Sequence, residues 1–144
     1  MATTITGANA IVTLQIPSLF PVPQQLQGFA ADDIFDTDAL ESAETLMGVD
    51  GIMSAGFVFV PVNQHYSLQA DSPSNFIFDT WWATQQLLQD LFLANAVVIL
   101  PAIGTKWALT KGALVSYKPI TDVKKLLQPR RHTIRWQSAI PQVS

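Results

Sequence analysis

One stretch of the sequence has a clear helical pattern, and it constrains the fold more than any other feature. Residues 68–95 run LQADSPSNFIFDTWWATQQLLQDLFLAN. Ser72 can cap a helix there, with Pro73 at the first helical position, where its missing N–H costs nothing. The apolar residues that recur at helical spacing are Ile77, Trp81, Leu88 and Leu91, with Phe92 beside them. No other stretch has such a pattern, so we expect one helix against a mostly β body.

The rest of the chain alternates as strands do. The segments with strand alternation are residues 9–16, 42–50, 52–62, 66–70, 96–100, 106–117 and 131–138. Asp50-Gly51 predicts a hairpin between the second and third of these, and Gly112 predicts a bend or bulge. In FVFVPV, both the Phe57 and Phe59 face and the valine face are expected to be buried. The pattern predicts about seven strands and one helix, which is a β-sandwich or barrel with a flanking helix.

The composition is unusual for a soluble monomer of 144 residues, which we expect to form one domain (1–144). Hydrophobic residues make up 49% and charged residues only 13% of the chain, against about 25% charged residues in ordinary domains. A free monomer would expose wide apolar patches, so we expect much of the surface to contact other protein. No run approaches the roughly 20 apolar residues of a membrane span, and MATTITGANA is unlike a signal peptide, which favours synthesis in the cytoplasm.

Charge is segregated along the chain. Residues 1–105 hold ten acids and no Lys or Arg, whereas residues 106–144 hold all eight basic residues and one acid, Asp122. Such asymmetry can guide head-to-tail association between copies. It can equally be neutralised inside one fold, and the sequence leaves both alternatives open.

No catalytic or cofactor-binding constellation is present in the sequence. A phosphate loop, a dinucleotide fingerprint, a zincin motif and cysteine are all absent. Asp32, Asp33 and Asp36 have a spacing that can bind magnesium, but no second carboxylate cluster supports it, so an acidic interface loop is favoured. His65 and His132 lie in strand patterns and are expected to be structural. We therefore expect no catalytic residue, no cofactor and no metal.

Three long motifs resemble a known family. They are SAETLMGVDGIMSAGFVFVPVNQ (42–64), LQADSPSN (68–75) followed by Phe78, Asp79 and Trp81 in an F-D-x-W pattern, and LQPRRHTIRW (127–136). They look like the tail tube proteins of contractile-tailed bacteriophages, and the resemblance covers residues 7–137. It implies hexameric rings that stack into a tube, with strands of all six copies forming a shared inner barrel, and an extended arm around residues 17–51.

The resemblance also implies partners and a location. Copies of the same chain, the sheath, the baseplate and the tail terminator proteins would contact the tube, and the tape measure protein and DNA would occupy its lumen without sequence specificity. The particle would be a virion tail, assembled in the host cytoplasm. The residues that we expect at subunit interfaces are Phe78, Trp82, Asp32, Asp33, Asp36, Lys124, Lys125, Arg130 and Arg131.

Two other classes of protein remain open. A terminator or baseplate adaptor would form a single ring instead of a polymer. A monomeric small-ligand barrel would enclose a dry apolar cavity. An enzyme is the least favoured class, since no acid, base and nucleophile come together.

Overall fold

The protein is mainly β with one helix, as the sequence predicts. The computed structural model describes residues 10–30 and 35–143. Its strands are β1 (Ile11–Ile16), β2 (Phe20–Gln25), β3 (Phe35–Thr37), β4 (Ala43–Met47), β5 (Met53–Phe57), β6 (Val62–Leu68), β7 (Ala94–Leu100), β8 (Thr105–Ser116), β9 (Arg130–Trp136) and β10 (Ser138–Val143), and the helix is α1 (Asn75–Leu88). Strands β2 and β10 were not expected from the sequence. In the described part of the chain, no helix is long and apolar enough to cross a membrane.

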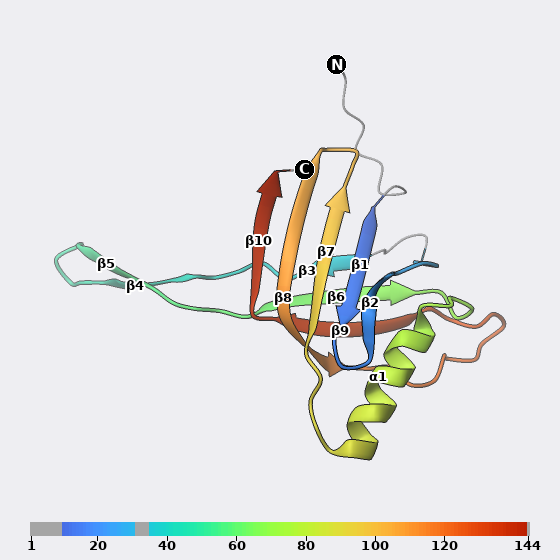
Figure 1. Ribbon diagram of the computed structural model, residues 1–144. Helices are drawn as coiled ribbons and strands as arrows, with labels where there is room; N and C mark the ends of the chain where they lie inside the picture. The colour runs from blue at the N-terminus through green and yellow to red at the C-terminus, as the bar shows by residue number, and fades with distance from the viewer. Residues whose placement is uncertain (1–9, 31–34, 144) are drawn as a thin grey trace.

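Eight strands form one antiparallel sheet that folds into two layers. Its order is β2-β1-β7-β8-β9-β6-β3, and β10 also pairs with β8. The strands β1, β7, β8 and β10 run steeply across β3, β6 and β9, and α1 lies beside the latter layer (Figure 1). The sheet does not close into a barrel, so the sandwich alternative is the better description. The shared barrel of a hexameric ring stays a prediction.

Strand β8 belongs to both layers because it bends in its middle. Its first half pairs with β7 and β10, and its second half pairs with β9. The register to β7 shifts near Gly112, and Lys111 adopts a left-handed φ of 50°. The Gly112 backbone lies directly against the rings of the fully buried Trp136, where no Cβ fits. The predicted bend at Gly112 is therefore confirmed.

The core fills the space between the layers and under the helix. Along β9 the predicted inward face is confirmed, because His132, Ile134 and Trp136 are all fully buried. On α1, Ile77 and Trp81 are buried as expected. Leu88 and Leu91 are instead 60% and 56% exposed, since the helix ends at Leu88 with Gln89 in a left-handed conformation. The C-terminal part of the expected apolar face, Leu88 and Leu91, is thus on the surface.

The helix begins two residues later than predicted. Its N-cap is Ser74, and Ser72 does not cap it. Both serine hydroxyls hold the backbone of Gln27 instead: Ser72 donates to the Gln27 carbonyl, and Ser74 accepts from the Gln27 N–H at 2.7 Å. A tertiary contact with a distant loop therefore overrides the local capping signal.

A polar and aromatic cluster fastens the helix to β9. The Arg130 guanidinium donates to Asp79 at 2.6 Å and to the Lys118 carbonyl at 2.9 Å. The Tyr117 hydroxyl also donates to Asp79. Burial raises the pKa of the Asp79 carboxyl, but hydrogen bonds from Arg130 and Tyr117 outweigh this effect and hold the pKa below its usual value. Asp79 and Arg130 are consequently both charged at neutral pH.

Four flat side chains stack in this cluster. His132 stacks on Phe78 with ring centroids 4.4 Å apart and on Tyr117 at 5.4 Å, and Tyr117 stacks on Trp82 at 5.2 Å. Burial and the positive charge of Arg130 lower the pKa of the His132 imidazole to about 4. The negative charge of Asp79 raises this pKa, but by less. The imidazole is therefore neutral at pH 7.

Substitution of Gly112 tests the bend. We expect Gly112→Ala to lower the free energy of unfolding by about 2–3 kcal/mol, because the new methyl group displaces Trp136 and Ile134. Gly56→Ala is the matched control, since a Cβ there meets nothing, and it should stay within about 0.5 kcal/mol. Urea unfolding measures both. Equal stabilities would contradict the packing described for Gly112.

Removal of the Asp79 carboxylate tests the helix attachment. Asp79→Ala leaves the Arg130 side chain, which is only 7% exposed, without its counter-charge. We expect a loss of about 2–3 kcal/mol, less than for a fully buried pair because Asp79 is half exposed. Asp122→Ala breaks the surface pair with Lys118 and should cost less than about 1 kcal/mol. If both variants unfold at the same urea concentration, the attachment is not stabilising.

The low pKa of the His132 imidazole predicts that acid lowers the stability of the fold. Folded His132 stays neutral to about pH 4, whereas the unfolded chain takes up that proton near pH 6.5. The unfolded state binds more protons between these values, so the free energy of unfolding should fall as the pH drops from about 6.5 to about 4. His132→Phe keeps the stack and removes the proton. Between about pH 7 and 4.5 this variant should lose about 2–3 kcal/mol less than the wild type, and an identical loss in urea titrations would refute the assignment.

Candidate functional site

A hairpin projects from the body of the molecule. It contains β4 and β5, which pair with each other from Ala43↔Phe57 to Met47↔Met53 and join no other strand. Figure 1 shows it extending away from the two layers. We call residues 39–61 the arm. The hairpin that Asp50-Gly51 predicts is confirmed, and every residue of β4 and β5 is exposed.

The arm exposes large apolar side chains. They are Leu40, Leu46, Met47, Val49, Ile52, Met53, Phe57 and Phe59. The expectation that Phe57 and Phe59 are buried was wrong: they are 72% and 90% exposed and contact each other edge to face. A continuous apolar run such as FVFVPV is typical of a strand buried on both faces, but it can also occur in an exposed ribbon, so the sequence pattern could not separate the two.

The pairing register gives the arm two unlike faces. Residues that pair directly share a face, so one side carries Ala43, Thr45, Met47, Met53, Ala55 and Phe57. Glu44 and Leu46 lie on the other side, opposite Gly56 and Ser54. One face is therefore apolar except for Thr45, and the other combines the apolar Leu46 with the acid Glu44.

Only part of the stretch expected as an arm, residues 17–51, projects from the body, because β2 and β3 belong to the main sheet. Residues 20–25 form edge strand β2, where Pro21 and Pro23 limit the addition of another strand. Residues 35–37 form β3, which pairs with β6. The projecting part begins only after Thr37 and continues to Pro61, beyond the expected end.

A second projecting segment links β8 to β9. We call residues 117–129 the connector. Within it Val123 bridges Leu127, and the Gln128 N–H donates to the Asp122 carbonyl at 3.0 Å. A closed turn results, and its tip presents residues 124–126. The exposed apolar side chains of the connector are Ile120, Val123, Leu126 and Leu127.

Several residues expected at interfaces have partners within the chain. Arg130 is buried and bound to Asp79, and Arg131 binds both oxygens of Asp36 at 2.9 and 3.1 Å. These two ion pairs join the acidic part of the sequence to the basic part. Part of the segregated charge is therefore neutralised within a single chain.

The remaining expected interface residues differ in accessibility. Phe78 is fully buried between Tyr66, Trp81 and His132, so the expectation that it meets another subunit is corrected by its place in the core. Trp82 is 40% exposed despite its stack on Tyr117. Lys124 and Lys125 are exposed. Asp32 and Asp33 lie outside the described residues, and the interface role of this set stays a prediction.

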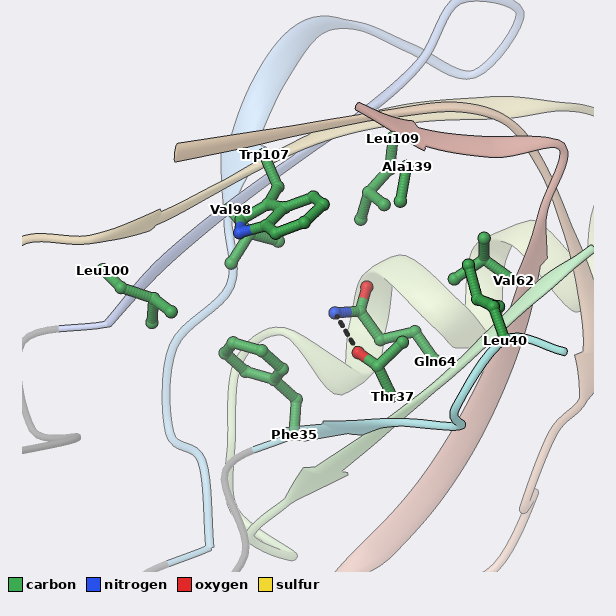
Figure 2. Close-up of a pocket in the computed structure, with 10 residues that line it drawn as sticks. All are labelled: Phe35, Thr37, Leu40, Val62, Gln64, Val98, Leu100, Trp107, Leu109 and Ala139. Atoms are coloured by element: carbon green, nitrogen blue, oxygen red, sulfur yellow. Dashed lines mark hydrogen bonds between the residues drawn. The ribbon is translucent and has the colours of Figure 1, made fainter. Parts of the chain in front are cut away.

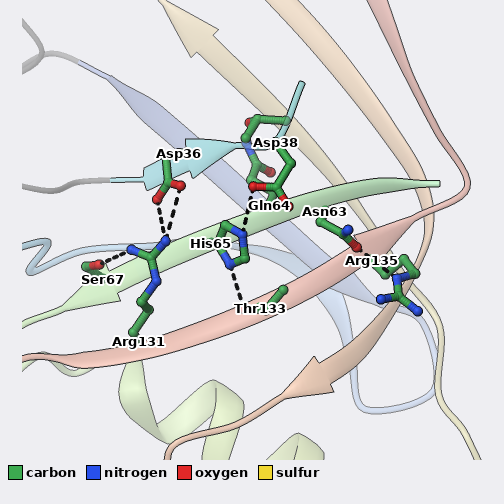
Figure 3. Close-up of polar contacts among 10 residues, drawn as sticks. Asp36, Asp38, Asn63, Gln64, His65, Ser67, Arg131, Thr133 and Arg135 are labelled. Carbon is green, nitrogen blue, oxygen red and sulfur yellow. Dashed lines mark hydrogen bonds and ion pairs between the residues drawn. The ribbon is translucent and has the colours of Figure 1, made fainter. Parts of the chain in front are cut away.

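A polar network covers the outer face of β3, β6 and β9 (Figure 3). His65 lies between Thr133 at 2.7 Å and Asp38 at 3.2 Å, beside the Asp36–Arg131 pair. The carboxylate oxygens of Asp36 and Asp38 and an imidazole nitrogen come within 4.8 Å of one another. Arg131 and His65 already engage these carboxylates. The arrangement is that of a surface hydrogen-bond network and supports no metal assignment.

A cavity of about 270 Å³ lies between the layers near the root of the arm (Figure 2). Its lining consists of Phe35, Thr37, Leu40, Val62, Gln64, Val98, Leu100, Trp107, Leu109 and Ala139. The Gln64 amide donates to the Thr37 hydroxyl at 3.2 Å. The lining side chains include no carboxylate, amine, imidazole or thiol, and the mainly apolar cavity can accept an apolar group.

The fold matches subunits of contractile injection particles. One chain of the anti-feeding prophage baseplate has a TM-score of 0.61 and 16% identity, with 99% of this chain and 98% of the other covered. A chain of the tube-terminating cap of that particle has a TM-score of 0.62 and 12% identity, with coverage of 100% and 94%. A chain of the PVC sheath/tube terminator in the extended state has a TM-score of 0.63 and 12% identity, with coverage of 99% and 99%.

Family membership rests on the sequence itself. No curated protein matches the chain. A family match nevertheless spans residues 3–140, nearly the whole sequence. The chain belongs to the tail fiber protein gp32 family.

Proposed function

We propose that the chain is a ring-forming structural subunit of a contractile tail, and that its arm holds a neighbouring copy. The observation that carries this proposal is the arm, whose apolar side chains project from the body without burial. Each such side chain gains about 1.5–3 kcal/mol when it is fully buried. Several of them together support a stable interface, even after the cost of ordering two partners.

Two positions in a tail fit this proposal. A tube subunit forms rings that stack into a long polymer and conduct DNA. A terminator or baseplate adaptor forms a single ring. The similarity to chains in a baseplate, a cap and a terminator supports the second position, and the similarity to a chain of the PVC sheath-tube complex supports the first. In either position the partners are copies of the chain, other tail proteins such as the sheath, and the tape measure protein and DNA in the lumen, and the chain acts without catalysis.

Removal of the apolar side chains of the arm tests the proposal. The triple variant Leu46→Ser, Val49→Ser, Phe57→Ser should remain a 15.8 kDa monomer where the wild type assembles. Its free energy of unfolding should stay within about 0.5 kcal/mol of the wild type, because these exposed side chains stabilise nothing in the body. Size-exclusion chromatography and negative-stain microscopy measure assembly, and urea unfolding measures stability.

The wild-type result separates the two positions. Long tubes support the tube subunit, and single rings support the terminator or adaptor. A matched control is Val22→Ser on β2, another exposed apolar residue outside the arm, which should leave assembly unchanged. Wild-type monomers at high concentration, or normal assembly of the triple variant, would overturn the proposal.

A further inference from the structure

We infer that the arm of one copy docks on the connector of a second copy, with the acids of the arm facing Lys124 and Lys125. The inference rests on the proposed function and adds the surface that receives the arm. It is carried by three observations: the charge left on the arm, the charge left on the connector, and the opposite directions in which the two segments project.

The arm has acidic charge that the body does not neutralise. Residues 39–61 contain Glu41, Glu44 and Asp50 and no basic residue. Among the described residues, these three carboxylates form no ion pair. Asp50 only accepts the Ile52 N–H within the turn. A docking partner of the arm must therefore combine positive charge with exposed apolar side chains.

The connector has this combination. Lys118 is paired with Asp122 at 3.1 Å, whereas Lys124 and Lys125, at the tip of the closed turn, form no ion pair within the described chain. Next to them, Leu126 and Leu127 are 75% and 59% exposed. These leucines border a depression of about 460 Å³, which is completed by Gln69, Ala70, Asp71 and Pro129.

Other surfaces fit the arm less well. The exposed end of α1 presents Leu87, Leu88 and Leu91, but residues 82–95 contain no basic residue that could face the acids of the arm. Lys106 and Lys111 occur singly along β8, away from each other. Arg130 and Arg131 are already paired with aspartates, and Arg135 is a single cation that donates to Asn63 at 2.8 Å. Lys124 and Lys125 are thus the adjacent cations of the described chain that remain available.

The two segments project on opposite sides of the molecule (Figure 1). An arm therefore does not reach the connector of its own copy. A contact between unlike surfaces of two copies is heterologous, so it repeats from copy to copy and produces a closed ring or an open stack. This is the type of contact that the proposed function requires.

Engineered cysteines test the contact directly, since the chain contains no native cysteine. Leu46 lies on the acidic face of the arm and Leu126 at the tip of the connector. A Leu46→Cys copy is mixed with a tagged Leu126→Cys copy under assembly conditions and oxidised. We expect a disulfide-linked heterodimer at least fivefold more abundant than with a tagged Val22→Cys copy, which places the thiol on exposed β2. Equal yields with both partners would overturn the inference.

Charge reversal tests the role of the lysines. Lys124→Glu with Lys125→Glu should raise the concentration needed for assembly at least tenfold, because like charges then face each other. Adding Glu41→Lys and Glu44→Lys to the same chain should restore assembly, and about 0.5 M salt should weaken the wild type. Assembly that is unaffected by the lysine reversal would refute this docking site.

The experiments separate this inference from the proposed function. If the wild type assembles through the arm but the cysteine at residue 126 is not linked and the lysine reversal has no effect, the arm docks elsewhere and the ring-forming function stands. If the triple arm variant assembles as the wild type does, the proposed function fails, and the docking site fails with it. Urea unfolding of each variant shows that losses of assembly do not come from unfolding.

Discussion

The close approach of Gly112 to the Trp136 ring is the constraint on which the rest of the body depends. It allows β8 to turn from one layer into the other, so a single strand pairs with β7 and β10 and then with β9. The bend places the inward face of β9 under the helix, where His132 meets Phe78. Without it the two layers would share no strand and enclose no common core.

Charge segregation along the sequence serves two purposes in the structure. Asp79–Arg130 and Asp36–Arg131 bring the acidic and basic parts together, the first by fixing the helix and the second by joining β3 to β9 across β6. Among the described charges that form no ion pair, Glu41, Glu44 and Asp50 lie on the arm and Lys124 and Lys125 on the connector, and the others are spread over the body. The alternatives that the sequence left open, contacts within a chain and contacts between chains, are therefore compatible.

Features governed by local chemistry could be predicted, and features governed by partners could not. The Asp50-Gly51 turn, the bend at Gly112 and the inward face of β9 follow from residue patterns and are present. The predicted start of the helix was wrong because the hydroxyls of Ser72 and Ser74 bind the backbone of a distant loop. The predicted burial of Phe57 and Phe59 was wrong because a continuous apolar run does not show whether the single chain itself covers both faces of a strand. Strand β10 was missed because SAIPQV contains a proline and has little alternation.

In the assembly that we propose, the arm has a consequence for how errors are avoided. A two-stranded ribbon that lies on no third strand is only marginally stable in water, and part of its ordering is completed when a neighbour covers it. The first contact of a single arm therefore has a lower net affinity than its apolar area alone gives, because ordering costs free energy, and it is released more readily than the completed interface. A copy that arrives in the wrong orientation leaves again, whereas a correctly placed one is retained by the contacts that follow. Weakness of the single arm thus gives a growing particle the reversibility that proofreading needs.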